Sequence, residues 1–320
     1  MGTLESGLFF RDGGNFLKKM TMLVLAAVLL IGTTACSKKA EQGPNSNASN
    51  TFMHLHGLGY SADGKRLFIP VHNGLQVYAD GSWNEGPGEK HDYMGFTAVD
   101  DGFYSSGHPA PGSKYKNPLG LVKSTNDGKT VSVISLEGEV DLHGMTAGFR
   151  SHTLYVTNPE PNSKMKQAGL FYSKDKGETW TNSPATGLQG QMTAIAAHPY
   201  DASIAAVGTT TGTYLSRDYG QRFTSLVPEQ PVSALTFTDS GNVLAATSGP
   251  NASLLEINIE SKESLAIKMP SKDTITYVVQ NPTDPKELVL TTEPKDVYLS
   301  TDRGATWIKI AEKGKTINRK

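Results

Sequence analysis

The sequence predicts an all-β fold, a six-bladed β-propeller assembled from hairpins that share one turn motif, with a seven-bladed ring as the alternative. Three observations lead to this prediction. A turn motif of eight residues recurs at regular spacing, and short strand-like segments recur in step with it. After residue 36, no apolar pattern with a 3.6-residue period runs long enough to indicate a helix. Strands and turns at regular spacing are typical of all-β repeat folds.

Residues 1–36 predict a signal peptide. Lys18 and Lys19 precede the apolar run MTMLVLAAVLLI, which has the length of a signal-peptide core and is short for a bilayer span. The run leads to TTACS, which resembles a bacterial lipobox although Thr33 stands where leucine is usual. Cys36 is the single cysteine of the chain, so we expect lipid attachment at Cys36 and no internal disulfide. These features predict a lipoprotein anchored to the cell membrane on its extracytoplasmic face.

Residues 37–51 predict a flexible tether, because they are polar and rich in serine and asparagine. The propeller domain is therefore expected over residues 52–320. The formal net charge is −1 and the chain has no basic block, so nucleic acid is not an expected partner. We expect a monomer whose partners are the membrane and a metal ion.

The motif Ser-x-Asp-x-Gly-x-Thr-Trp is the repeat that defines the blades. It is intact at 173–180 and 300–307, and weaker copies occupy 124–131 and 216–223. In such a hairpin the aspartate caps its own turn, glycine supplies a positive φ and the aromatic residue packs between sheets. The wide gap before residue 300 predicts a decayed copy near 258–263, and a shortened turn occupies 77–83. The count is therefore six blades.

Each blade is predicted to contain four strands. The expected inner strands are 54–60, 94–99, 142–149, 192–197, 232–237 and 275–280. The expected second strands are 66–71, 102–106, 153–157, 203–208, 242–247 and 287–292. Third strands are expected to run into the turn motifs.

Six of the eight histidines fall where they should face one mouth of the central channel. In a propeller, the start of a first strand and the end of a second strand lie on the same face, next to the axis. The histidines at such positions are His54, His56, His72, His91, His108 and His143. All six come from the first three blades. His54 and His56 are two residues apart, so strand alternation directs both to the same side.

This group predicts a transition-metal site. Imidazole is the commonest metal ligand, and packing many imidazoles together without partners would cost desolvation free energy. Met94 and Met145 occupy the same register, and thioethers beside imidazoles favour copper over zinc. Asp92 and Asp141 are expected to orient histidines. If a zinc ion with an open position supported hydrolysis, Asp92 would be the candidate catalytic base.

The chain also resembles a family of exported bacterial Asp-box (BNR-repeat) proteins, commonly described as glycosyl hydrolases or sialidase-like, with propellers of the sialidase and sortilin type. The resemblance rests on the turn motif, which looks like the Asp box, and on segments 54–58, 91–96 and 106–109. It implies hydrolysis of a neutral glycan as an alternative function, which would require two carboxylates near the bond. The carboxylates that could approach the mouth are Asp92, Glu139, Asp141, Glu160 and Glu293, and no spacing singles out a pair.

Sialidase activity is not expected, because sialidases hold their carboxylate substrate with three arginines at the channel mouth. Here Arg66 and Arg150 map to the opposite face. The other arginines near the blades, Arg217, Arg222 and Arg303, lie in or beside turn motifs. A further alternative is a protein-interaction scaffold, since one fold hosts many functions.

Overall fold

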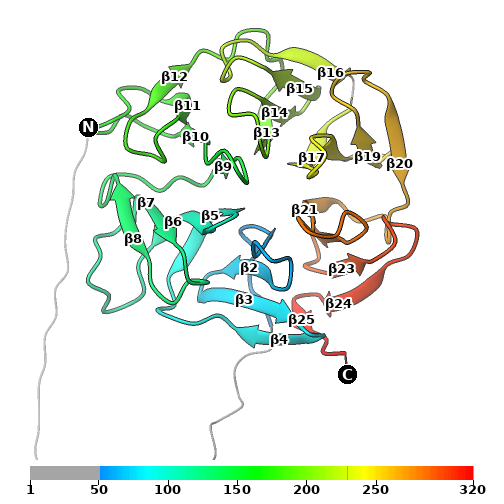
Figure 1. Cartoon of the computed structure of the whole chain (residues 1–320), viewed down its shortest axis with the longest axis horizontal. Coiled ribbons are helices and arrows are strands. Elements are labelled where there is room, and N and C mark those ends of the chain that lie inside the picture. Colours follow the sequence, from blue (N-terminus) through cyan, green and yellow to red (C-terminus); the bar gives the residue numbers. More distant parts are fainter. Residues whose placement is uncertain (1–50, 229, 320) are drawn as a thin grey trace, which may run out of the picture. The chain divides into compact units, whose positions relative to one another are not determined.

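The computed structural model describes residues 51–228 and 230–319, which form six antiparallel sheets arranged in a ring around a central axis (Figure 1). The prediction of an all-β six-bladed propeller is therefore confirmed. The expected signal peptide, Cys36 and most of the expected tether lie outside the described residues. Within the described ranges, no helix is long and apolar enough to cross a membrane.

In each blade the strands follow the chain order from the axis outward. Blade one contains β1 (Gly59–Tyr60), β2 (Leu67–Val71), β3 (Gly74–Ala79) and β4 (Ser82–Glu85). Blade two contains β5 (Asp92–Val99), β6 (Gly102–His108), β7 (Leu121–Ser124) and β8 (Ser132–Ser135). Blade three contains β9 (Met145–Ala147), β10 (Leu154–Asn158), β11 (Gly169–Ser173) and β12 (Thr181–Ser183).

The second half of the ring repeats this order. Blade four contains β13 (Met192–Ala197), β14 (Ala205–Thr209), β15 (Gly212–Ser216) and β16 (Thr224–Pro228). Blade five contains β17 (Val232–Phe237), β18 (Val243–Thr247), β19 (Leu254–Ile257) and β20 (Ser264–Ile267). Blade six contains β21 (Ile275–Gln280), β22 (Leu288–Thr292), β23 (Val297–Ser300), β24 (Ile308–Glu312) and β25 (Lys315–Thr316).

The inner strands β13, β17 and β21 have the predicted bounds at both ends. The prediction was too long in blade one, where the ladder is limited to β1, and in blade three, where it is limited to β9. In blade one, a Cβ atom on Gly57 would lie 3.1 Å from Pro70 of the partner strand β2, and proline has no NH to donate to a ladder. A Cβ atom on Gly59 would lie 2.7 Å from the Ala98 Cβ, so glycine permits the close approach of the next blade.

Four of the six inner strands carry a β-bulge near the channel mouth. The ladder shifts register between Tyr93 and Gly95 in β5, and equivalent shifts occur near the starts of β13, β17 and β21. A bulge adds a residue to one strand and redirects the side chains beside it. Side-chain directions at the mouth therefore depend on these bulges as well as on strand alternation.

Neighbouring blades are joined by apolar clusters and by threonine hydroxyl groups near the axis. The backbone NH of Ala147 donates to Thr97 Oγ1 at 3.1 Å, which joins blade three to blade two. The backbone NH of Ala197 donates to Thr146 Oγ1 at 3.3 Å, which joins blade four to blade three. These bonds satisfy buried backbone groups that the inner ladders leave unpaired.

The turn motif forms the hairpin that its residues predict. In the copy at 173–180, Ser173 Oγ accepts a hydrogen bond from the Gly177 NH at 2.8 Å, and Gly177 has a φ of 95°. Asp175 accepts bonds from both the NH and the hydroxyl group of Thr179. The aromatic residues Trp180 and Trp307 each pack against an apolar cluster that includes residues of two blades. The motif is therefore structural.

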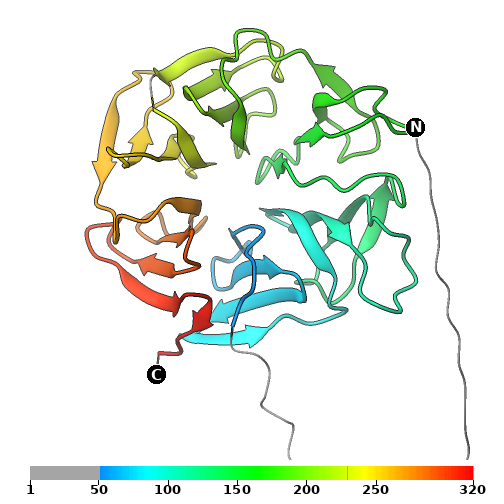
Figure 2. The same cartoon turned by 180° about the vertical axis from the view of Figure 1, so that it is seen from behind.

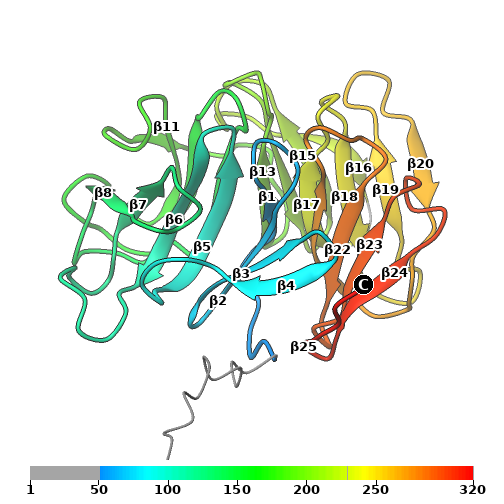
Figure 3. The same cartoon turned by 60° about the horizontal axis from the view of Figure 1, so that its bottom comes forward.

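The two ends of the described chain close the ring, as Figures 2 and 3 show beside β4 and β25. Phe52 donates its NH to the Gly314 carbonyl at 2.8 Å. Trp83 packs on Phe52 with ring centroids 5.1 Å apart, and its Nε1 donates to the Ile310 carbonyl at 2.7 Å. Residues of blade one and blade six thus interlock at this seam.

Candidate metal centre

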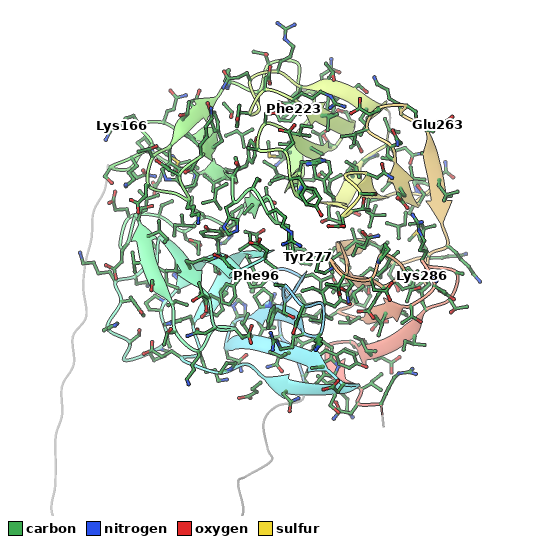
Figure 4. The ribbon with its side chains drawn as sticks, viewed as in Figure 1. Phe96, Lys166, Phe223, Glu263, Tyr277 and Lys286 are labelled. Atoms are coloured by element: carbon green, nitrogen blue, oxygen red, sulfur yellow. The ribbon has the colours of Figure 1, made fainter. Side chains whose placement is uncertain are left out.

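The centre of the ring contains a cavity of about 770 Å³, lined by residues from the inner strands of all six blades. Threonine and alanine make up much of its wall. Figure 4 shows Phe96 and Tyr277 near the axis, whereas Lys166 and Glu263 lie at the outside. Among the predicted ligands, His54, His143 and Met145 line the cavity. The histidine rim therefore opens onto the central cavity.

Three imidazoles of blade one gather at this rim, and with Asp92 of β5 they form the group that we term the blade-one cluster. The ring centroids of His54 and His72 lie 4.8 Å apart, and those of His56 and His72 lie 4.6 Å apart. The rings of His54 and His56 are stacked with an interplanar angle of 11°. The prediction that His54 and His56 point to the same side is confirmed.

Asp92 fixes the orientation of the His72 ring. The Nδ1 atom of His72 lies 2.9 Å from each carboxylate oxygen of Asp92, so the ionised carboxylate accepts the Nδ1 proton. The neutral ring then carries its lone pair on Nε2, which is the arrangement that carboxylates impose on metal-binding histidines. This is the orienting role expected for Asp92. Asp92 makes no described contact that would identify it as a catalytic base.

His56 supplies a second nitrogen for an ion. Its backbone NH donates to the Pro70 carbonyl at 3.0 Å, which ties the residue to β2. Its Nε2 atom is buried and has no hydrogen-bond partner. His56, His72 and Asp92 each offer a ligand atom, and these atoms lie within 4.8 Å of one another. Three side chains are therefore close enough to share one metal ion.

The surroundings of His56 keep its imidazole neutral. Burial lowers the pKa of His56 below its ordinary value of 6.5, positive charge on His72 lowers it further, and Asp92 opposes the change. Metal ions bind the neutral imidazole. His56 should consequently remain a competent ligand at a lower pH than an exposed histidine.

His108 and His143 form a second group around Asp141, which we term the Asp141 group. The His143 Nε2 atom lies 2.6 Å from Asp141 Oδ2, and the His108 Nε2 atom lies 3.4 Å from the same oxygen. His108 also contacts Asn117 Oδ1 through Nδ1 at 2.6 Å. The six predicted histidines are therefore not one cluster. They divide between two groups, with one residue left over.

That remaining residue is His91, which is 2% exposed. The Ala110 NH donates to its Nδ1 at 2.9 Å, so the proton lies on Nε2, which faces Glu89 at 3.4 Å. Tyr115, from the segment between β6 and β7, packs edge-on against the ring. Both nitrogens have partners, and these contacts indicate a packing role for His91.

The predicted methionine ligands have different surroundings. Met145 is 7% exposed and belongs to the apolar cluster between blades two and three, where its sulfur lies close to Gly95. Met94 is half-buried on β5 beside the bulge. The described contacts bring neither thioether against the blade-one imidazoles.

A further histidine–carboxylate group, absent from the sequence prediction, consists of Asp100, Asp101 and His152. The His152 Nε2 atom lies 2.6 Å from Asp100, and its Nδ1 atom lies 3.2 Å from the Tyr104 hydroxyl. Lys123 pairs with Asp101, so each group already has a partner. The signal was available, because both hairpins follow inner strands of adjacent blades and reach the same face.

The remaining carboxylates and arginines lie in varied places. Glu293 lines the cavity, whereas Glu139 accepts two bonds from Ser163 on an exposed loop. Glu160 is exposed, and its carbonyl accepts a bond from Asn158. Arg66, Arg150, Arg217 and Arg303 form ion pairs with Asp127, Asp100, Glu260 and Glu256 respectively. In the described ranges, no arginine lines the cavity.

Comparison with solved structures supports the fold. The chain is similar to a GH74 enzyme of Niastella koreensis, with a TM-score of 0.56 and 13% identity over 81% of this chain and 45% of that one. A GH74 xyloglucanase of Xanthomonas campestris gives a TM-score of 0.52 and 15% identity, with the same coverage. The chain thus spans less than half the length of these enzymes.

A structure of a nidogen/laminin complex is also similar, with a TM-score of 0.55 and 12% identity over 73% of this chain and 88% of that one. No family model and no curated protein matches the sequence. At these identities the likeness concerns the backbone arrangement. The chain is therefore a β-propeller structurally similar to GH74 propellers, with histidine and aspartate groups that could hold a metal ion.

Proposed function

We propose that this protein binds a transition-metal ion at the blade-one cluster. The observation that carries the proposal is the buried, unpartnered Nε2 of His56 beside His72, whose Nδ1 proton is taken by Asp92. A buried nitrogen without a partner costs free energy. An ion bound by His56 and His72, with His54 as a third imidazole, would offset that cost. Asp92 would hold His72 in the binding tautomer.

Copper is the proposed metal, in preference to zinc. The donors that the cluster brings together are nitrogen and oxygen atoms, which suit copper(II) and zinc alike. For a given site of this type, affinity generally increases along the first-row series up to copper(II) and is lower for zinc(II). The preference for copper therefore depends on this affinity order. It does not depend on the expected thioether ligands, because Met145 packs in the core.

The place of binding would be the extracytoplasmic face of the cell membrane. The apolar run at 20–31 and the lipobox-like Cys36 support export and lipid anchoring. Mass spectrometry of the mature protein tests this, because a diacylglyceryl group on Cys36 is the expected modification. An unmodified Cys36 in the membrane fraction would contradict it.

Metal titration tests the proposed function. The full chain, purified in mild detergent and freed of metal with a chelator, should take up copper(II) with imidazole nitrogen couplings in its electron paramagnetic resonance spectrum. His56→Ala and His72→Ala should each bind one equivalent less than the unchanged protein. His198→Asn is the matched control, because asparagine Oδ1 can accept the bonds that Tyr200 NH and Asp201 NH donate to His198 Nδ1. Equal uptake by all variants would contradict the proposal.

A second candidate is hydrolysis of a neutral glycan, and the central cavity is the observation that favours it. Its volume of about 770 Å³ is within the usual range for small-molecule sites, and Tyr277 and Glu293 line it. Turnover of neutral aryl glycosides that is lost in Glu293→Gln and kept in Glu139→Gln would support this function. No turnover across the panel would contradict it.

A further inference from the structure

We infer that the Asp141 group is a second cation site, in which His108, Asp141 and His143 bind a divalent transition-metal ion separately from the blade-one cluster. The three side chains come from two neighbouring blades. His108 ends β6, whereas Asp141 and His143 precede β9. The same Asp141 oxygen faces both imidazoles, at 3.4 Å and 2.6 Å.

The hydrogen bonding of His108 is the first observation that supports a second cation site. Its Nδ1 atom lies 2.6 Å from Asn117 Oδ1, and an amide oxygen can only accept, so Nδ1 bears the proton. In the neutral ring, Nε2 then presents a lone pair. That lone pair faces the carboxylate oxygen of Asp141 at 3.4 Å, which is an electrostatically unfavourable pairing. A cation between the two atoms would make the contact favourable.

The surroundings of Asp141 are the second observation. Its side chain is 15% exposed, and its Oδ1 atom is buried without a hydrogen-bond partner. A half-satisfied, buried carboxylate is costly. An ion bound through this carboxylate would use the free oxygen and neutralise the negative charge, which now accepts a hydrogen bond from His143 Nε2. Asp141 Oδ1 and the lone pair of His108 Nε2 are therefore both available to a cation.

Rotation of the His143 ring would allow the three ligands to converge. Zinc and copper require nitrogen atoms about 2.0–2.1 Å from the metal, so the ligand atoms must come closer together than they are now. His108 already directs Nε2 at Asp141 and can keep its bond to Asn117, whereas the His143 side chain is 60% exposed and has room to turn. His143 would give up its hydrogen bond to Asp141 and present a nitrogen lone pair to the ion. Asp141 would be the fixed member of the site.

The two sites would be neighbours on one rim. Asp92 of the blade-one cluster lies directly opposite His108 in the β5–β6 ladder. Opposed residues of an antiparallel pair have Cβ atoms about 5 Å apart and share a face of the sheet. Two ions could thus bind side by side at the mouth of the cavity that His54 and His143 line.

Metal counting tests the second site. The full chain, freed of metal, is equilibrated with copper(II) or with zinc(II) alone, desalted and assayed for metal and protein. Two equivalents are expected for the unchanged chain and for the His198→Asn control. His108→Ala and Asp141→Asn should each retain one equivalent, and Asp141→Asn combined with His72→Ala should retain none. Asp141→Asn preserves side-chain size, so we expect it to fold. Comparison of its melting temperature with that of the unchanged chain checks this.

The outcomes separate this inference from the proposed function. If the unchanged chain binds one equivalent that His108→Ala and Asp141→Asn both keep, the second site is wrong and the blade-one site stands. If the single equivalent is lost in Asp141→Asn and kept in His72→Ala, the blade-one site is wrong and the second site stands. If the unchanged chain binds no metal, both are wrong.

Discussion

The Nδ1 atom of His72 lies 2.9 Å from both carboxylate oxygens of Asp92, across the boundary between blades one and two. This relationship gives the blade-one cluster a defined tautomer and joins the ligand-bearing segments of two sheets. It also explains why Asp92 would affect metal affinity through the orientation of His72, although its carboxylate also lies close enough to bind the ion.

Asp92→Asn should weaken copper(II) binding at the blade-one cluster by about 10–100-fold, since loss of an orienting carboxylate typically has an effect of this size. The amide retains one acceptor for the His72 proton but loses the charge that makes the ring more basic. Competition with a chelator of known affinity measures the change. Asp80→Asn is the control, because Asp80 lies in the exposed turn between β3 and β4. It should leave the affinity unchanged.

His91→Ala should lower the free energy of unfolding by about 1–3 kcal/mol, because the Ala110 NH loses its acceptor. Metal stoichiometry should not change, since both ring nitrogens already have partners. Chemical denaturation and metal counting on the same preparation check both parts. A lost equivalent of metal would restore His91 to the ligand set.

Acidification should destabilise the metal-free protein below about pH 6.5. Burial lowers the pKa of His56, His91 and His198 from the ordinary value of 6.5. Below that value the unfolded chain binds more protons than the folded chain, so stability increases with pH in this window and levels off above it. Denaturant midpoints between pH 5 and 8 measure the slope. His198→Asn should flatten it, and an unchanged slope would contradict the assignment.

Trp83→Ala should cost about 3–5 kcal/mol of unfolding free energy, which is typical of a large buried aromatic residue. The substitution removes the contact with Phe52 and the bond to the Ile310 carbonyl, both of which hold the seam. Denaturation of the full chain measures the loss. Tyr200→Ala, at a residue that is 51% exposed, should cost far less.

The repeat was sufficient to predict the sheet order and most strand bounds, because each blade is a local meander and the spacing of turn motifs fixes its register. The prediction overestimated the length of β1, where Pro70 of the partner strand has no NH to donate to the ladder. The close approach of Gly59 to Ala98 could not be predicted, because it depends on the neighbouring blade. Local sequence does not contain that contact.

The site was predictable in part for the same reason. The prediction correctly placed His54 and His56 on one side, although both residues precede β1, and blade register correctly brought His72 beside them. The surroundings of His91 depend on the long segment after β6, which contributes Tyr115 and Ala110. Its path is not encoded in any repeat. Asp92 and Asp141 divide the histidines between two groups. This division depends on how each imidazole ring is rotated, which the spacing of residues in the sequence cannot specify.

The seam also sets an order of events during folding. Tyr60 donates to Glu287 across 227 positions of sequence, whereas each blade pairs strands that are close along the chain. Contacts between distant segments form slowly, because the intervening chain must first lose conformational freedom. All members of the blade-one cluster lie within residues 54–92. We therefore expect the cluster to assemble early and the ring to close last, when blade six pairs with blade one.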